Sequence, residues 1–336
     1  MKKSHSNVRQ TDWRASPPHT SADKQSLKKG GKMKKALLCF VSVVFLTLEG
    51  LAFMSKDGSG TTSGQFLKLG IGARAVSMGE AFTGISDDAT AIYWNPSGIS
   101  RLTQKEISLM YAMWFEEISY NNLFYVHPMK IGNFGLGLQY VSYGSLDGLD
   151  ENGNPTDDFT PTDLAITISY SRNIKGIDTG ISAKYISSKI KETATAIAFD
   201  IGAMKQVIEE KLNIGLVVTN LGSGLKYISE ESPLPMNIKI GAGYKITKDI
   251  TTAIDIVIPS DNEIIFSAGG EYNYRIKENL ILSGRLGYNT ITKEIDGLKG
   301  ITAGLGANYK NYKLDYAFVP YGDLGNTHRI SFGIKF

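Results

Sequence analysis

The sequence predicts an all-β fold: a transmembrane, antiparallel, up-and-down β-barrel of about 14 strands with an N-terminal plug segment. Three observations lead to this prediction. A leader of the kind that directs export opens the chain, apolar and polar residues alternate from residue 105 onward, and short connections alternate with longer ones between the alternating segments.

The leader covers residues 1–52. Residues 1–32 are polar, and Met33 precedes two lysines, an apolar run from Ala36 to Leu48, and the small-residue pattern Gly50-Leu51-Ala52. A basic start, a short apolar core and a small-residue cleavage site are typical of a secretory signal peptide. The apolar run is short for a helix that spans a bilayer. We therefore expect residues 1–52 to be removed during export.

Removal of the leader changes the charge of the chain. The whole sequence has a formal charge of +3, but residues 1–52 hold 10 of its 36 basic and 3 of its 33 acidic residues. The remaining 26 basic and 30 acidic residues give a net charge of −4, which argues against nucleic acid as a partner. The single cysteine, Cys39, lies in the leader, so no disulfide or thiol chemistry is expected afterwards.

The alternation has the period of two that a strand with one apolar face requires. In residues 236–246 every even-numbered residue is apolar, whereas the odd-numbered ones are asparagine, lysine or glycine. Most such segments have roughly 8–12 residues, which suits a tilted membrane strand. The expected strands are 105–113, 117–127, 132–144, 163–172, 177–188, 194–206, 212–220, 236–246, 249–258, 263–275, 279–289, 300–309, 311–320 and 328–336.

The connections fall into a short and a long class. The long ones are 145–162, 221–235 and 290–299. Short turns at one end and long loops at the other are typical of outer-membrane barrels. Because an even number of strands returns the chain to the end where it started, we expect both termini on the periplasmic, short-turn side of a bacterial outer membrane.

A soluble β-sandwich would also alternate, but three features favour the barrel. The apolar faces carry few charges in mid-strand, tyrosine and phenylalanine recur near segment ends, and the chain ends on Phe336 within an alternating segment. Aromatic girdles mark the two membrane interfaces of such barrels. The expected partners are therefore the lipid bilayer of the outer membrane and the outer-membrane assembly machinery.

The opposite, inward face carries charges of both signs interleaved with glycine. Two interpretations stay open: the charges pair with one another or with a plug, or they solvate the wall of a lumen. These residues are Lys184, Asp200, Lys239, Lys245, Asp255, Glu271, Arg275, Arg285, Lys313, Asp315, Arg329 and Lys335.

Residues 53–103 precede the barrel, which covers residues 104–336, and are predicted to form a hatch in its periplasmic mouth. Asp87 and Asp88 suit the start of a short helix. The pair Asn95-Pro96 is expected to end that helix in a turn. Two adjacent acids could also serve acid–base chemistry, but the sequence shows neither a partner nor a groove for it.

The stretch 72–100 resembles the N-terminal signature of the PorV/PorQ family of outer-membrane proteins, which is related to the FadL-type (FadL/OmpP1-like) long-chain fatty acid transporters. That signature contains Gly-Ala-Arg-Ala, Met-Gly-Gly-Ala-Phe, Asp-Asp and Tyr-Trp-Asn-Pro-Ala-Gly-Leu. This sequence departs from it at Glu80, Ser97 and Ile99, and only Glu80, in place of glycine, is expected to alter the packing of the hatch. The matching residues are Gly72, Ala73, Arg74, Ala75, Met78, Gly79, Ala81, Phe82, Asp87, Asp88, Tyr93, Trp94, Asn95, Pro96 and Gly98.

The resemblance implies a hatch-plugged barrel with one of two functions. A FadL-type barrel takes up hydrophobic small molecules past the hatch. A PorV-type barrel of the type IX secretion route receives secreted proteins and delivers them to a surface attachment complex, here through the loops at 145–162 and 221–235. A purely structural envelope role is the third alternative. The candidate hatch and ligand-binding residues are Phe82, Asp87, Asp88, Tyr93, Trp94, Asn95 and Pro96; we expect cargo to contact the three aromatic residues, and the Asn95-Pro96 turn to shift.

No enzymatic activity is predicted. After the leader only His127 and His328 remain, each isolated, and neither a Gly-x-Ser-x-Gly motif nor a histidine–cysteine cluster with metal-ligand spacing is present. Asp150 begins a calcium-like loop, but Pro155 and Pro161 stand where that loop needs glycine and glutamate. We therefore expect no catalytic residue, no metal and no cofactor.

Overall fold

The computed structural model describes residues 60–114, 118–291 and 299–336. The described residues all belong to one compact unit of the chain, which lies within Ala52–Phe336. The predicted leader, residues 1–52, and the first residues of the predicted hatch lie outside the described residues. In the described part of the chain, no helix is long and apolar enough to cross a membrane.

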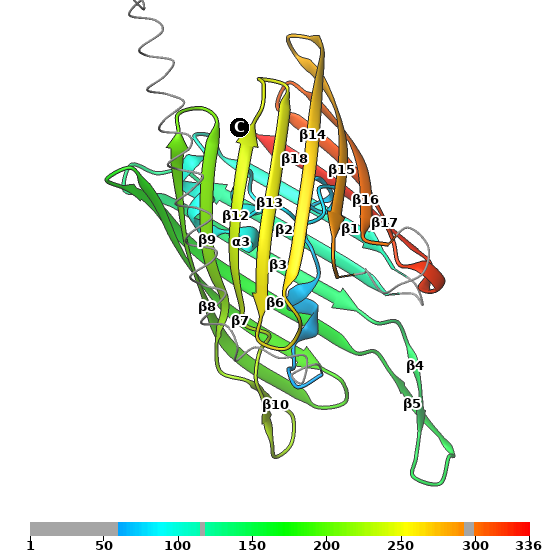
Figure 1. Ribbon diagram of the computed structural model, residues 1–336. Coiled ribbons are helices and arrows are strands. Elements are labelled where there is room, and N and C mark those ends of the chain that lie inside the picture. The colour runs from blue at the N-terminus through cyan, green and yellow to red at the C-terminus, as the bar shows by residue number, and fades with distance from the viewer. Residues whose placement is uncertain (1–59, 115–117, 292–298) are drawn as a thin grey trace, which may run out of the picture. The chain divides into compact units, whose positions relative to one another are not determined.

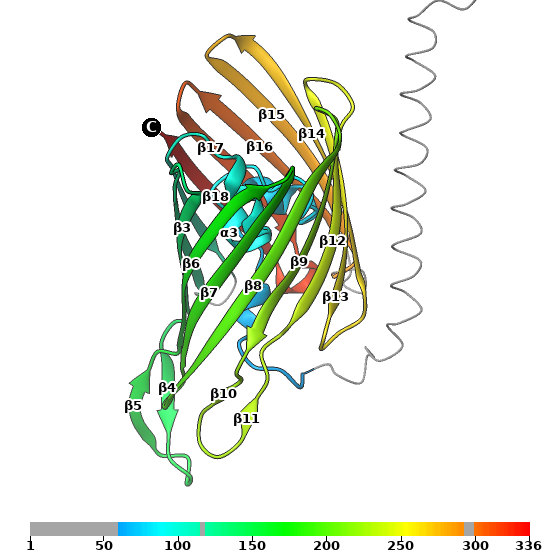
Figure 2. The ribbon, with the colours of Figure 1, turned by 90° about the vertical axis from the view of Figure 1, so that its left-hand side faces the viewer.

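Fourteen strands form one closed antiparallel barrel (Figures 1 and 2), which confirms the predicted fold class and strand number. The first and last barrel strands pair with each other, Glu106 opposite Lys335 and Met113 opposite His328, and so close the ring. The strands are β1 (Glu106–Met113), β2 (Ser119–His127), β3 (Asn133–Ser142), β6 (Thr162–Ile174), β7 (Ile177–Lys189), β8 (Thr193–Ile208), β9 (Leu212–Gly222), β12 (Asn237–Lys245), β13 (Ile250–Pro259), β14 (Ile265–Lys277), β15 (Leu280–Asn289), β16 (Ile301–Tyr309), β17 (Tyr312–Pro320) and β18 (Asn326–Lys335).

The two ends of the barrel differ in their connections. At the short-turn end, β6 and β7 are joined by Lys175 and Gly176, both at positive φ (52° and 83°), as a tight hairpin turn requires. At the long-loop end, two connections carry hairpins of their own: β4 (Leu146–Leu149) with β5 (Pro155–Phe159), and β10 (Leu225–Lys226) with β11 (Glu231–Ser232). Figure 2 shows both hairpins at the end opposite to the C-terminus. The sequence predicted long loops here but not these hairpins.

The barrel wall has an apolar outer face. Along β8, residues alternate between exposed and buried from Thr193 to Phe199, as the period-two pattern predicts. Large apolar side chains such as Leu136, Ile168 and Leu305 are more than half exposed. Water would disfavour so much apolar surface, whereas the hydrocarbon of a bilayer solvates it.

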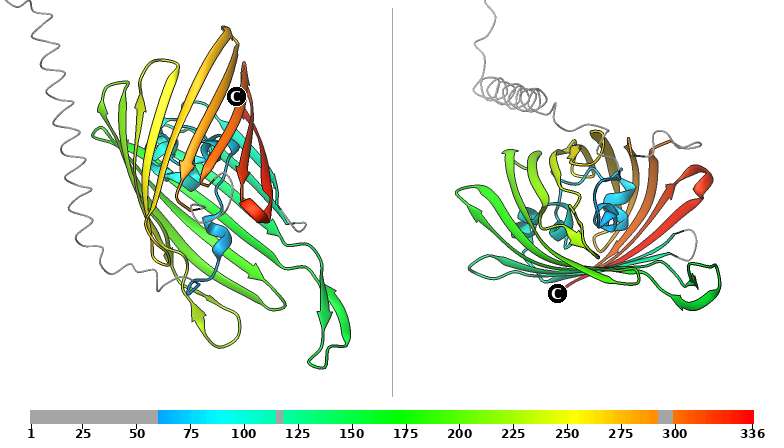
Figure 3. Two further views of the ribbon diagram at one scale, coloured as in Figure 1. Left: turned by 45° about the vertical axis from the view of Figure 1, so that its right-hand side comes forward. Right: turned by 90° about the horizontal axis from the view of Figure 1, so that it is seen from below.

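The described part of the predicted hatch, residues 60–103, lies within the ring of strands (Figure 3), and we call it the hatch segment. It packs on strands on both sides of the lumen: its second helix touches β15 to β18, and its last touches β3, β6, β7 and β8. Its elements, in the same numbering as the strands, are η2 (Gln65–Lys68), α2 (Ala73–Ser77), α3 (Ala91–Trp94) and η3 (Pro96–Arg101), of which α2 and η3 make these contacts.

The hatch segment extends farther than the predicted position in the periplasmic mouth. The amide of Ser63 donates to the carbonyl of Pro233, in the β9–β12 connection at the long-loop end (2.8 Å). The backbone amide of Lys105, just after the segment, donates to the carbonyl of Phe336 at the short-turn end (3.1 Å). The segment therefore runs through the barrel from one end to the other.

Inward-facing glycines let the backbone of the hatch segment approach the wall. A Cβ atom on Gly180 of β7 would lie 2.4 Å from the carbonyl carbon of Pro96. A Cβ atom on Gly269 of β14 would lie 2.3 Å from the carbonyl oxygen of Met78. Any larger residue would push the hatch away, which explains why glycine alternates with polar residues on the inner face.

The glycine contacts can be tested with two neighbouring residues. Gly269→Ala should destabilise the barrel by about 1–3 kcal/mol, the usual cost of overpacking, because its methyl group meets Met78. Gly270→Ala is the matched control, since a Cβ atom there has no neighbour within 4 Å. The measurement is the temperature at which the compact band of the unboiled protein in SDS gels converts to the unfolded band. Equal shifts in the two variants would contradict the packing described.

Candidate functional site

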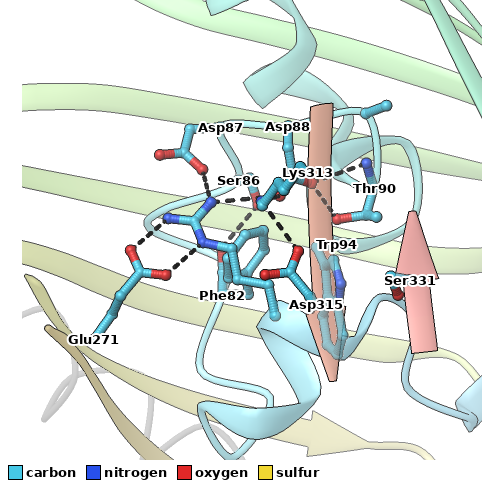
Figure 4. Close-up of polar contacts among 12 residues, drawn as sticks. Phe82, Ser86, Asp87, Asp88, Thr90, Trp94, Glu271, Lys313, Asp315 and Ser331 are labelled. Carbon is cyan, nitrogen blue, oxygen red and sulfur yellow. Dashed lines mark hydrogen bonds and ion pairs between the residues drawn. The ribbon is translucent and has the colours of Figure 1, made fainter. Parts of the chain in front are cut away.

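Six charged side chains form a closed ring of alternating sign on the short-turn side of the lumen. Figure 4 labels four of them, Asp88, Glu271, Lys313 and Asp315. Two of them belong to the hatch segment and four project inward from β14, β15 and β17. Each member therefore has an opposite charge on both sides. In order, the ring runs Arg74, Glu271, Arg285, Asp315, Lys313, Asp88 and back to Arg74.

Arg74 is the main link between the hatch segment and the wall. Its guanidinium binds Glu271 through two hydrogen bonds, Nε to Oε2 at 2.8 Å and Nη2 to Oε1 at 3.0 Å. Its Nη1 lies 2.5 Å from Asp87 and 3.4 Å from Asp88. Such a planar, two-point contact fixes position as well as charge. Arg74 therefore sets where the hatch sits against β14.

The other half of the ring lies in the wall. Arg285 contacts Glu271 at 2.7 Å and Asp315 at 2.8 Å, and all three side chains are at most 5% exposed. Lys313 lies 3.6 Å from Asp315 and 3.4 Å from Asp88. In this ring the interior charges pair with one another and with the hatch. This agrees with the first of the two interpretations of the sequence, in which the inward charges are paired and do not merely solvate a lumen wall. Arg275 and Lys335 line the short-turn end of the lumen, as predicted, and pair with Asp249 (3.3 Å) and Glu106 (3.4 Å). Like Lys245, they lie near strand ends and are exposed.

Asp88 also shapes the start of α3. Its Oδ1 accepts hydrogen bonds from the amide of Thr90 (3.0 Å) and from the hydroxyl of Thr90 (2.5 Å). The helix begins at Ala91, later than the predicted start at the acidic pair, because Asp88 forms a turn before the first helical residue. Asp87 differs from its neighbour: its side chain is 43% exposed and lies beside Arg74.

The Asn95-Pro96 turn follows α3, as predicted, and leads into η3. The Asn95 side chain is fully buried and both its polar atoms are used. Its Oδ1 accepts from the amide (3.2 Å) and hydroxyl (2.6 Å) of Ser97, and its Nδ2 donates to the carbonyls of Thr83 (3.2 Å) and Ala203 of β8 (3.4 Å). A shift of this turn would therefore break hydrogen bonds to the hatch and to the wall.

The three predicted aromatic residues pack together. The rings of Tyr93 and Trp94 are perpendicular, with centroids 4.9 Å apart, and Phe82 meets Trp94 edge-on at 6.2 Å. Trp94 Nε1 donates to the carbonyl of Ile71 (2.9 Å), and the Tyr93 hydroxyl donates to that of Leu67 (3.1 Å). All three rings are almost completely buried in the protein.

A cavity of about 310 Å³, here called the upper cavity, lies on the long-loop side of this cluster. Of the predicted site residues, Tyr93 and Trp94 line it, whereas Phe82 and the Asn95-Pro96 turn do not. Its other apolar lining includes Leu67, Leu69, Val257, Ile265 and Trp114, and its charged lining includes Glu80, Lys184 and Lys239.

A second cavity of about 290 Å³, the lower cavity, opens on the short-turn side. Asp87 and Asp88 line it together with other charged groups, among them Arg74, Glu271 and Lys313 of the ring. The structure thus separates the predicted site residues that line cavities into two groups. Asp87 and Asp88 face the lower cavity at the short-turn end, and Tyr93 and Trp94 face the upper cavity at the long-loop end, with the hatch segment between the two cavities.

Glu80 takes an unusual backbone conformation. Its φ is +66°, in the left-handed region that favours glycine, the residue that the family signature has at this position. The positive charges of Arg329 and Lys239 lie near the Glu80 carboxylate. The departure noted in the sequence therefore places a carboxylate on the wall of the upper cavity.

Asp261, in the β13–β14 connection, fastens the start of the hatch segment at the long-loop end. Its Oδ2 accepts hydrogen bonds from the hydroxyl of Thr62, from Gln65 Nε2 (3.2 Å) and from Lys68 Nζ (2.9 Å). Burial by itself would raise the pKa of Asp261, but these three donors outweigh it and hold the pKa below its usual value. Within residues 60–114, 118–291 and 299–336, no group of three or more His, Cys, Asp or Glu side chains is arranged to hold a metal ion.

The sequence family follows from a direct match. A model of the family described as "Type IX secretion system protein PorV" matches residues 54–265, more than half of the chain. The chain belongs to the PorV family. Among curated proteins, this PorV-family chain is 27% identical over 214 residues to a UPF0164 protein of Treponema pallidum (strain Nichols). The match covers 57% of the chain and 52% of that protein, so the chain spans about half the length of the curated relative.

Solved structures similar to this PorV-family barrel include two toluene transporters and a FadL homologue. TodX of Pseudomonas putida has a TM-score of 0.55 at 13% identity, covering 79% of this chain and 96% of TodX. TbuX of Ralstonia pickettii has 0.53 at 14% (80% and 98%), and a Pseudomonas aeruginosa FadL homologue has 0.51 at 10% (79% and 97%). At these identities the likeness shows the fold alone, which is a closed β-barrel like those of these three proteins.

Sequence reasoning missed the roles of several residues in this site. Arg74 belongs to the family signature, and that position was the only available signal. Lys239 was placed on the inward face by the alternation, but nothing in the sequence indicated which cavity it faces. Asp261 lies just after a strand, and no pattern marked it as the partner of residues 62–68.

Removal of Arg74 tests the charge ring. Arg74→Ala should destabilise the barrel by about 3–5 kcal/mol, because buried Glu271 and Asp88 each lose a counter-charge. Arg275→Ala is the control: its ion pair with Asp249 is 58% and 44% exposed, and such surface pairs contribute about 0–1 kcal/mol. Unfolding in urea, followed by the gel shift, measures both. A small loss for Arg74→Ala would contradict the ring.

The Asp261 contacts predict a dependence on pH. Because the folded pKa is depressed, their stabilisation is complete above the unfolded value of about 3.9 and is lost as pH falls through the lower folded value. Amide-exchange protection of residues 62–68 should therefore fall selectively in acid. Asp261→Asn should show low protection already at neutral pH. Protection in the wild type that stays constant down to the unfolding pH would disprove this account.

Proposed function

We propose that this outer-membrane barrel binds a hydrophobic ligand in the upper cavity and moves it across the membrane by displacing the hatch segment. The observation that carries the proposal is that Tyr93 and Trp94, which belong to the hatch, line the upper cavity. A ligand in this cavity therefore touches the element that separates it from the lower cavity.

The upper cavity suits a compact ligand. Its volume of about 310 Å³ is at the small end of the ~300–1,000 Å³ typical of ligand pockets. Leu67, Leu69, Val257 and Ile265 provide apolar contact beside the two aromatic rings. Long-loop ends of such barrels face the cell exterior, so a ligand would enter from outside.

The connectivity suggests how binding would move the hatch. Trp94 directly precedes the Asn95-Pro96 turn and is held by one hydrogen bond to the carbonyl of Ile71. A ligand that displaces the indole ring would also displace the adjacent turn. The hydrogen bonds of the Asn95 side chain that hold this turn are all to neutral groups. Displacement of this layer would join the upper and lower cavities, while the charge ring retains the rest of the hatch.

A second candidate function is that of a carrier for secreted proteins. The description of the family supports it, and so do the two hairpins at the long-loop end. Leu146, Leu149 and Ile228 on or between their strands are 45%, 58% and 86% exposed. Exposed apolar side chains on protruding hairpins are suited to hold a polypeptide partner.

Tryptophan fluorescence tests the first function. Trp13 lies in the predicted leader, while Trp94 and Trp114 both line the upper cavity. In the protein reconstituted in lipid bilayers, 4-bromotoluene should quench this emission saturably. Tyr93→Ala should weaken the affinity about tenfold through lost aromatic contact. Tyr274→Ala, on the 58%-exposed outer surface, should leave it unchanged.

The outcome separates the two functions. Quenching that does not saturate, or that falls equally in the Tyr93 and Tyr274 variants, would rule out ligand binding in the upper cavity. The carrier function is tested by replacing residues 146–159 with a short Gly-Ser turn and measuring surface display of the cell's secreted proteins. Loss of display with ligand binding intact would favour the carrier.

A further inference from the structure

Two opposite charges face the upper cavity without pairing with each other. Glu80 and Lys239 both line it, yet they form no ion pair, so their charged atoms lie more than 4.0 Å apart. Lys184, on the same wall, is different, because it contacts Asp200 and Asn220 at 2.8 Å each. Unpaired charge inside a protein is disfavoured, so this exception needs a physical reason.

The Glu80 carboxylate is unfavourable in two ways. Among the described residues it accepts no hydrogen bond and has no cation within 4.0 Å. Its backbone is also held at φ +66°, a conformation that costs a non-glycine residue about 1–2 kcal/mol. Glycine at this position would avoid both penalties. Strain that the surrounding fold maintains often marks a site where the side chain has a role.

Arg329, the other cation near Glu80, makes two hydrogen bonds within the described part of the protein, whereas its buried Nε makes none there. Its Nη1 donates to the carbonyl of Gly70 at 2.8 Å, and its guanidinium lies 5.9 Å from the ring centre of Trp114. It has no carboxylate within 4.0 Å in the described part of the chain. Arg329 thus lowers the electrostatic penalty of the Glu80 carboxylate from a distance, and the carboxylate oxygens remain able to accept hydrogen bonds.

The Lys239 ammonium lies over the rings of Tyr93 and Trp94, which line the upper cavity. Its Nζ is 5.3 Å from the ring centre of Tyr93 and 5.1 Å from that of Trp94, and the residue is 9% exposed. In the described residues it has no carboxylate within 4.0 Å and donates no hydrogen bond. The rings stabilise the cation from one side, which leaves its donors available to a group in the cavity.

We propose that the upper cavity binds a small amphipathic zwitterion: a ligand with an ammonium group for Glu80, a carboxylate for Lys239, and an apolar body against Tyr93 and Trp94. This inference rests on the proposed function and narrows its ligand class. One such ligand satisfies both unpaired charges at once. In a site of low dielectric, charge-assisted hydrogen bonds of this kind discriminate strongly against ligands that lack either group.

Four probes that share a phenylethyl unit test the proposal. Phenylalanine carries both charges, 3-phenylpropionate only the carboxylate, phenethylamine only the ammonium, and ethylbenzene neither. Calorimetric titration of the full chain in lipid bilayers should rank phenylalanine first. Glu80→Gln should weaken phenylalanine and phenethylamine about tenfold and leave 3-phenylpropionate unchanged. Lys239→Gln should weaken phenylalanine and 3-phenylpropionate instead.

A second variant separates binding from folding. Glu80→Gly removes the strain as well as the carboxylate, so it should raise the gel-shift temperature while losing affinity for the two amines. If ethylbenzene or 3-phenylpropionate binds as tightly as phenylalanine, or if Glu80→Gln weakens all four probes alike, the zwitterion proposal is wrong although the cavity binds ligands. If none of the four probes binds, the proposed function itself fails, and this inference with it.

Discussion

The contact between Arg74 and Glu271 joins the hatch segment to the barrel wall, and the buried charges of each part are balanced only when the two are together. Glu271, Arg285 and Asp315 lie in the wall with almost no exposure to water, and the ring that balances them closes only through Arg74 and Asp88 of the hatch segment. Buried charges are tolerated when each has counter-charges and hydrogen bonds on all sides. An empty barrel of this sequence would therefore hold an open, unbalanced row of charges, so the hatch is part of the folded interior.

The hatch segment is held differently on its two sides. Toward β14 and β17 the hatch makes ion pairs of the charge ring, besides the close approach of Met78 to Gly269. Toward β7 and β8, η3 fits against inward glycines such as Gly180 and Gly202, where the backbone or the Asn95 side chain occupies the space of a side chain. On this side Arg101 of η3 also pairs with Asp178 of β7 at 2.6 Å. The η3 side therefore depends on one ion pair and on shape, whereas the α2 side belongs to the closed charge ring.

The period-two alternation was sufficient to predict the barrel, its strand number and its inner face, because in a membrane every strand must satisfy the same two-sided environment. It could not predict the β4–β5 and β10–β11 hairpins, since the loops outside the membrane are free of that constraint. Nor could it pair Arg74 with Glu271 or Lys68 with Asp261, because each pair joins residues almost two hundred positions apart. Tyr93 and Trp94 were predicted as a pair from the signature, but their position between two cavities depends on the path of the whole hatch segment.

Magnitudes indicate how the proposed displacement would proceed. Each neutral hydrogen bond that holds the Asn95-Pro96 turn contributes about 0.5–1.5 kcal/mol net, and entering water or a polar ligand can replace it. Separation of Arg74 from Glu271 and Asp88 would cost about 3–5 kcal/mol for each buried charge left short of a partner, and an apolar ligand offers no substitute. A ligand can shift the hatch only by its difference in affinity for the two positions. In the proposed mechanism the Asn95-Pro96 turn between α3 and η3 therefore moves first, while α2 and Asp88 remain attached to the charge ring. This division also keeps the unpaired Glu80 and Lys239 on the side from which a ligand arrives, and the fully paired charges on the side where the hatch is anchored.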